Sequence, residues 1–324
     1  MHDASGHEEV ITASSGVRDT YYGIPVIRAP NWHWMVVNYL FLGGIAGGNY
    51  CLSVLADWFS NDRTLARAAR YLSMAAFIPC PALLALDLGR PDRAHHMLRI
   101  VKLRSPLSLG SWAMALLGVF SGATVGPQLL SDLLHRDILP GPRRVIGLLG
   151  LPVGLFFSGY TGLLLAITNV PVWARNSLLM GPTFLASAFS TTFASISLVL
   201  NLTGQERPDT ARKLARAETV CLLAEFNLLL NGILRLGKLG RPLTTGTRGM
   251  LFWPLTFVGG VLLPLGLQAA GPASGREASR ERQIATSLLV LIGGYVLRAV
   301  MIFAGHESAN RPEDYFEYTR LSEG

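Results

Sequence analysis

Five ionisable residues fall within or at the ends of long apolar stretches of this sequence: Asp57, Asp87, Glu218, Glu225 and Arg298. A charged side chain in the middle of a membrane costs about 3 kcal/mol or more unless it is paired or hydrated, so each is a candidate functional residue. Asp57, at the end of its stretch, is interpreted as interfacial. Glu218 and Glu225 are seven residues apart and share one helical face. Together with Asp87 and Arg298 they suit a proton path; the alternative is a structural pair such as Glu225 with Arg298.

A second group of polar residues would meet near one membrane face. In a sequence of alternating helices, His33 begins the first apolar stretch, Asp87 ends the second and Tyr160 lies late in the fourth, while Arg298 lies about two turns below that face. Reduction of a quinone moves two electrons and two protons, so its site needs hydrogen-bonding or proton-donating groups at each carbonyl. A tyrosine, a histidine and an aspartate meet this need.

The same groups would serve a different class of protein. An eight-helix proton-coupled transporter or channel for a polar substrate would line its path with residues such as Asp87, Glu225 and Arg298. This transporter is therefore the alternative function.

Signatures of resident redox cofactors are missing from the sequence. None of the seven histidines lies in the middle of an apolar stretch, where the two axial ligands of a haem b would be needed. Cys51, Cys80 and Cys221 are isolated from one another, and no P-loop or G-x-G-x-x-G motif opens a helix. We expect no haem, no iron–sulfur cluster and no metal site in this protein, so redox chemistry would need electron carriers on another subunit.

The elements that must position these residues are membrane-spanning helices. The protein has 324 residues, of which 50% are apolar and only 15% charged, against about 25% charged in soluble proteins. This composition predicts an all-α integral membrane protein with eight transmembrane helices, arranged as two four-helix bundles with both termini on the same side. The domain plan is a polar N-terminal tail over 1–33, the membrane domain over 34–304 and a C-terminal tail over 305–324. The apolar stretches run over about 35–58, 70–88, 108–130, 144–168, 179–202, 215–236, 250–270 and 284–304.

Small residues and prolines predict local features of these helices. Gly43, Gly44, Gly47 and Gly48 form ridges in the first stretch that allow close helix packing. Pro79 and Pro81 predict a kink in the second, the shortest stretch.

Several motifs resemble those of the NrfD-like family, the membrane subunits of polysulfide reductase and related complexes. They are Y-G-I-P at 22–25 with W-H-W at 32–34 and Y-L-F-L-G-G-I-A-G-G at 39–48, D-L-G-R-P at 87–91 with S-P-L-S-L-G-S-W at 105–112, and S-G-Y-T-G at 158–162 with T-N-V-P-V-W at 168–173. The second half matches mainly in hydropathy.

This resemblance implies a cofactor-free, quinone-binding anchor subunit in the cytoplasmic membrane of a prokaryote. Such a subunit exchanges electrons between a docked, ferredoxin-like iron–sulfur subunit and membrane quinone (menaquinone or ubiquinone), and the iron–sulfur subunit contacts a catalytic subunit, typically one with molybdopterin. The partners expected are these subunits and membrane lipid, with no nucleic acid.

The resemblance also assigns individual residues. Tyr160 falls on the quinone-binding tyrosine of the family, Asp87 on an acidic position of the quinone site and proton route, and Glu225, more loosely, on an acidic position of the sixth span. Six residues after His33, where the family carries a quinone-contacting histidine, this sequence has Tyr39. The second quinone carbonyl would then be met by Tyr39, His33 or Asn38.

A basic run follows the D-L-G-R-P motif. We expect it to dock an acidic partner, with a lipid-headgroup contact as the alternative. The run consists of Arg90, Arg93, Arg99, Lys102 and Arg104, with His95 and His96 among them.

Overall fold

The computed structural model describes residues 27, 30–60, 62–88, 91–99, 101–102, 104–205, 207–273 and 279–323. Within these ranges the secondary structure is helical, and eight helices are long and apolar enough to cross a membrane. The predicted all-α membrane fold with eight spans is therefore confirmed.

The first four spans come from the N-terminal half. They are α1 (Trp34–Leu55) continued by the π-helix η2 (Ala56–Ser60), α2 (Arg63–Phe77) followed by α3 (Pro79–Asp87), α4 (Pro106–Leu134) and α5 (Pro140–Ala166). A 3-10 helix, η3 (Pro91–Leu98), lies between α3 and α4 in the sequence.

The last four spans follow the short α6 (Pro171–Ala174). They are α7 (Ser177–Leu202), α8 (Pro208–Leu236) extended by η4 (Gly237–Gly240) and α9 (Arg241–Thr244), then α10 (Gly246–Leu251) with η5 (Phe252–Leu262) and α11 (Leu263–Ala273), and finally α12 (Arg280–Ala309).

Proline and capping residues set several of these boundaries. The second span is divided at Ile78, between α2 and α3. Ile78 keeps helical backbone angles and donates to the carbonyl oxygen of Met74, whereas Pro79 and Pro81 have no N–H to donate to the helix. At the start of α4, Ser105 is the N-cap and Pro106 the first helical residue, an arrangement that suits the unpaired N–H groups of a helix start.

The eighth span is longer than the sequence predicted. α12 reaches Ala309, and α13 (Pro312–Glu323) follows where a tail was expected. Proline at the start and two acidic residues, Glu313 and Asp314, in the first turn explain why this polar segment forms a helix.

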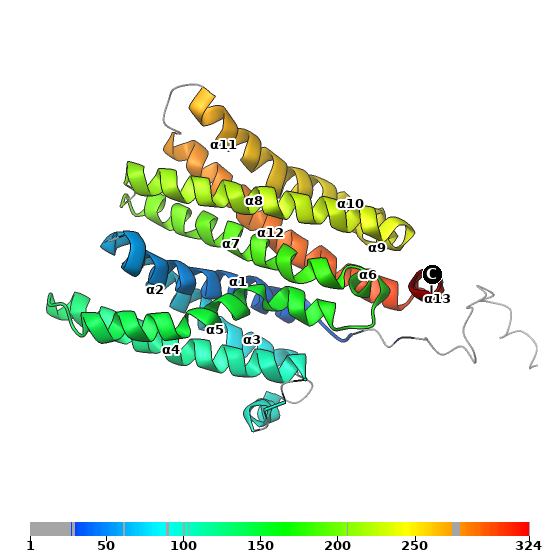
Figure 1. Cartoon of the computed structure of the whole chain (residues 1–324), viewed down its shortest axis with the longest axis horizontal. Coiled ribbons are helices and arrows are strands. Elements are labelled where there is room, and N and C mark those ends of the chain that lie inside the picture. The colour runs from blue at the N-terminus through cyan, green and yellow to red at the C-terminus, as the bar shows by residue number, and fades with distance from the viewer. Residues whose placement is uncertain are drawn as a thin grey trace, which may run out of the picture.

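Helix α1 lies at the centre of the molecule. Figure 1 shows it between α2–α5 on one side and α7, α8 and α10–α12 on the other, and it contacts α2, α3, α5, α7 and α12. Its glycines permit this: a Cβ added at Gly47 would lie 2.6 Å from the carbonyl oxygen of Gly154, and one at Gly48 1.9 Å from Oγ1 of Thr192. The ridge of small residues therefore serves close helix packing.

The start of α1 and the end of α12 lie together, at the end of the molecule where Figure 1 marks the C-terminus. The ring centroids of Trp34 and Phe303 are 4.7 Å apart. We call this end of the helix domain the proximal end, and the opposite one the distal end.

Candidate functional site

His33 and Asp87 form a contact at the proximal end. His33 precedes α1 and Asp87 is the last residue of α3, and Nδ1 of His33 lies 3.4 Å from Oδ1 of Asp87. The Asp87 side chain is 10% exposed and that of His33 is 63% exposed. Oδ1 of Asp87 is buried and, among the described residues, has no hydrogen-bond partner. A nearly buried carboxyl group thus lies next to an exposed imidazole, a side chain that can take up or release a proton near neutral pH.

Tyr160 on α5 and Tyr39 on α1 are both buried. The Tyr160 hydroxyl donates to the carbonyl oxygen of Pro106 at 3.0 Å. Its ring packs so closely on Gly110 that a Cβ there would lie 2.2 Å from the hydroxyl oxygen. Phe157 lies between the tyrosines, with ring centroids 6.2 Å from Tyr39 and 6.4 Å from Tyr160. Tyr160 therefore holds the start of α4 against α5.

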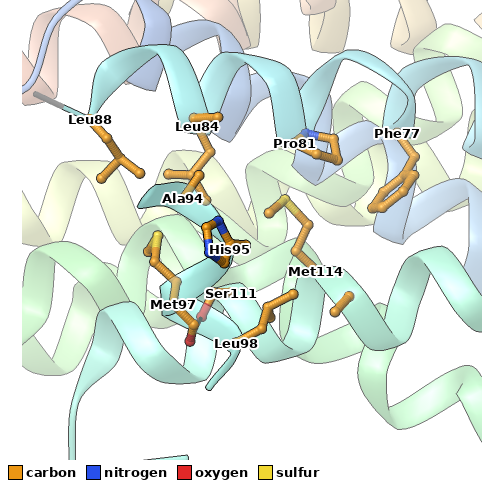
Figure 2. Close-up of a pocket in the computed structure, with 12 residues that line it drawn as sticks. Phe77, Pro81, Leu84, Leu88, Ala94, His95, Met97, Leu98, Ser111 and Met114 are labelled. Carbon is orange, nitrogen blue, oxygen red and sulfur yellow. Dashed lines mark hydrogen bonds between the residues drawn. The ribbon is translucent and has the colours of Figure 1, made fainter. Parts of the chain in front are cut away.

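An apolar cavity of about 340 Å³ lies between α3, η3 and α4. Figure 2 shows side chains from these elements converging on it, with the His95 ring among them. Two lining residues flank Asp87 in the sequence: Leu88 is the next residue, and Leu84 comes three residues before it. The cavity is lined by Phe77, Pro81, Leu84, Ala85, Leu88, Ala94, His95, Met97, Leu98, Ser111, Met114 and Ala115. Its volume and lining are in the range of sites for small apolar ligands, which span about 300–1,000 Å³.

Arg298 is fully buried in the middle of α12. Its guanidinium lies between the rings of Phe41 and Phe184, 5.5 and 5.8 Å from their centroids. Nη1 donates to the carbonyl oxygen of Gly294 at 2.8 Å and contacts Oγ of Ser187 at 3.4 Å. Nε and Nη2 have no partner among the described residues. Phe41 lies about two turns along α1 from His33, so the structure separates Arg298 from the His33–Asp87 contact.

Glu225 and Glu218 are both buried on α8. Glu225 accepts a hydrogen bond from Oγ of Ser190 at 2.8 Å, and it also interacts with Ser187 and electrostatically with Arg298. Ser187 therefore touches both the carboxylate and the guanidinium. Such a buried pair suits a structural role as well as proton transfer, because either charge alone would be strongly unfavourable in an apolar interior.

Glu218 lies two turns from Glu225, towards the start of α8. It hydrogen-bonds with Gln268 of α11, while its Oε1 atom has no partner among the described residues. A series of polar groups thus runs along the inner face of α8 towards the distal end.

The remaining predicted residues lie elsewhere. Asn38 is directed towards α12, where its Oδ1 accepts a hydrogen bond from the hydroxyl of Tyr295 at 2.8 Å. Asp57, in η2 at the distal end of the first span, pairs with the buried Arg70 of α2. Arg93, Arg99, Lys102 and Arg104 are exposed on and after η3, and Arg90 lies outside the described residues.

Three residues have roles that the sequence did not reveal. The sequence places His95 in the basic docking run, yet this residue lines the cavity. Arg70 joins Asp57 to Gln128, whose Oε1 lies 2.6 Å from Nη1 of the arginine. Trp173, inside a quoted motif, is fully buried and donates from Nε1 to the carbonyl oxygen of Met301 at 3.0 Å. Only the last had a sequence signal, the T-N-V-P-V-W motif.

No group of three or more potential metal ligands occurs among the residues that the structure describes.

Eight apolar helices with charged side chains buried between them define a multi-pass integral membrane protein. The protein belongs to the NrfD family: the family model described as "Polysulphide reductase, NrfD" matches residues 27–308. The C subunit of the polysulfide reductase of Wolinella succinogenes is 26% identical to it over 304 residues, which cover 85% of this protein and 94% of that subunit. The family resemblance seen in the motifs is therefore confirmed.

Proposed function

We propose that this protein is the quinone-reactive membrane subunit of a reductase complex. It would exchange electrons between a docked iron–sulfur subunit and menaquinone or ubiquinone in the cytoplasmic membrane of a prokaryote. Membership of the NrfD family supports the role in a complex, since the relative from Wolinella succinogenes is one subunit of a polysulfide reductase. The observation that carries the proposal is the apolar cavity whose lining residues Leu84 and Leu88 flank Asp87 in the sequence, together with the His33–Asp87 contact.

In this proposal the cavity binds the quinone ring, and the His33–Asp87 contact handles the protons. A quinone ring and the start of its isoprenoid tail are apolar and suit side chains such as Leu84, Met114 and Phe77. Reduction of one quinone to a quinol consumes two electrons and two protons. The electrons would pass between the quinone and the iron–sulfur subunit, while Asp87 would exchange the protons with the quinone and, through His33, with water. Neither Tyr160 nor Tyr39 lines the cavity, and the Tyr160 hydroxyl is bonded to Pro106, so a quinone contact of either tyrosine would need a pose that extends beyond the cavity.

The partner would dock on the proximal end, over the cavity. Arg93, Arg99, Lys102 and Arg104 are exposed there, on and after η3, and suit an acidic surface. Docking on this segment would bring the partner's electron carrier close to the quinone. The iron–sulfur subunit would in turn contact a catalytic subunit, of the molybdopterin class.

Glu218, Glu225 and Arg298 would connect the site to the distal end. Ser187 and Ser190 lie between the buried charges, so protons can pass over short steps with hydration by internal water. Moving one charge across the membrane against 100 mV costs about 2.3 kcal/mol, which is small enough to couple to quinone chemistry.

The test fills the cavity without touching a charged residue. Ala115→Phe adds a ring inside the cavity, whereas Leu116→Phe, at the next position, adds one on an exposed face of α4. In membranes containing the complex, Ala115→Phe should lower quinone-linked turnover about tenfold or more, because the added ring occupies the volume that the quinone needs and a loss of about 1.4 kcal/mol of binding energy is a factor of ten. Leu116→Phe should leave it unchanged, and the partner's activity with a soluble dye should be normal in both. Equal turnover in the two variants would overturn the proposal.

A further inference from the structure

The cavity contains two polar side chains among its twelve lining residues, His95 and Ser111. The Ser111 hydroxyl bonds to backbone carbonyl oxygens, at 3.0 Å to Ser108 and 3.5 Å to Met97. Among the described residues the His95 imidazole has a ring contact with His96 and no hydrogen bond. His95, an exposed residue of η3, is therefore the cavity's available polar group at its solvent side.

We infer that His95 is the hydrogen-bonding contact for the oxygen-bearing headgroup of the ligand in this cavity, and that it positions the ring there. The inference deepens the proposed function and rests on it. The neutral imidazole carries one N–H donor and one acceptor nitrogen. It can thus donate to a quinone carbonyl and accept from a quinol hydroxyl, so the contact survives both redox states. Leu84 and Met114 would contact the apolar part of the ring.

The element that carries His95 explains how the ring is held. η3 covers the cavity with Ala94, Met97 and Leu98 as well as His95, and Figure 2 shows the imidazole among these side chains. His96 meets the His95 ring edge-on, with centroids 4.3 Å apart. A 3-10 helix has three residues per turn, so the two histidines point in different directions, and only His95 is a lining residue.

His96 provides a matched control. It is the same residue type, on the same element, one position away, and it does not line the cavity. The experiment uses the full-length protein purified in detergent and titrated with a short-tailed quinone, with binding followed by quenching of tryptophan fluorescence. The variants are His95→Leu, His95→Gln, His96→Leu and the cavity-filling Ala115→Phe, each checked for its melting temperature and monodispersity.

We expect His95→Leu to weaken quinone binding about three- to tenfold, the effect of one hydrogen bond. His95→Gln, which keeps a donor and an acceptor, should retain part of the affinity, and His96→Leu should match the wild type. If Ala115→Phe abolishes binding while His95→Leu and His96→Leu both match the wild type, the cavity binds quinone and the assignment of His95 is wrong. If the wild-type protein binds no quinone, both the assignment and the proposed function fail.

Discussion

Nδ1 of His33 lies 3.4 Å from Oδ1 of Asp87, and the two side chains differ about sixfold in exposure, 63% against 10%. The two residues are far apart in the sequence and come from the start of α1 and the end of α3. The contact therefore joins a nearly buried carboxyl group to an exposed imidazole at the proximal end.

Asp87→Asn should lower quinone-linked turnover about 100-fold, since a positioned general acid contributes about 10²–10⁴. His33→Gln should have a smaller effect, because water can reach the small exposed part of Asp87. The assay is quinone-linked turnover in membranes, with the partner's dye-linked activity as the control for assembly. Full turnover in Asp87→Asn would remove Asp87 from the proton route.

Glu225 and Arg298 should depend on each other for stability. Glu225→Gln removes the carboxylate that acts on the fully buried guanidinium of Arg298 through Ser187, without a direct ion pair between the two groups, so it should cost less than the about 3–5 kcal/mol of a broken buried ion pair. Adding Arg298→Met should recover much of this loss. Melting temperatures of the two single variants and the double variant in detergent measure the coupling, and strictly additive shifts would contradict it.

The same pair allows a separate test of proton movement. In vesicles holding the complex, Glu225→Gln should abolish charge translocation while quinone-linked turnover continues. A normal membrane potential in this variant would favour the purely structural role of the pair.

Close packing of α1 predicts a contrast between two glycines. Gly48→Ala places a methyl group 1.9 Å from Oγ1 of Thr192, so something must shift, at a cost of about 1–3 kcal/mol. Gly266→Ala on α11 meets nothing within 4 Å and should raise stability slightly, because alanine favours helix over glycine by about 1 kcal/mol. The melting temperatures of the two variants in detergent should therefore shift in opposite directions. An unchanged melting temperature in Gly48→Ala would show that α1 and α7 are less tightly packed.

We expect the docking of α13, which lies outside the spans, to depend on pH through the carboxyl group of Asp314. Burial raises the pKa of its carboxyl group above the ordinary value of 3.8, although Arg311 opposes the shift. A carboxyl whose pKa is higher in the docked helix favours docking when protonated, and this contribution is lost as the pH rises through that pKa. Asp314→Asn should therefore hold α13 more firmly at neutral pH. Slower cleavage by trypsin after Arg320 would show it, and unchanged cleavage at pH 7 would contradict it.

Much of the fold was predictable because hydropathy is a local property. The eight spans follow from runs of apolar residues, and the break at Ile78 follows from Pro79 and Pro81. The length of α12 and the helix α13 were not predicted, because the signals past residue 304 are capping and tertiary contacts rather than hydropathy. Glycine spacing indicated that α1 packs closely, and the structure adds that its partners at Gly47 and Gly48 are α5 and α7.

The sequence by itself determined the number of spans, the family motifs and the short set of ionisable residues in apolar surroundings. Only the tertiary structure decided which of these residues meet. It places His33 in contact with Asp87 and bonds the Tyr160 hydroxyl to the carbonyl oxygen of Pro106. It also bonds Asn38 to the Tyr295 hydroxyl and places His95 in the lining of an apolar cavity. The physical reason is that helix length depends on local composition, whereas the rotation of each helix and its neighbours depend on packing between segments far apart in the sequence.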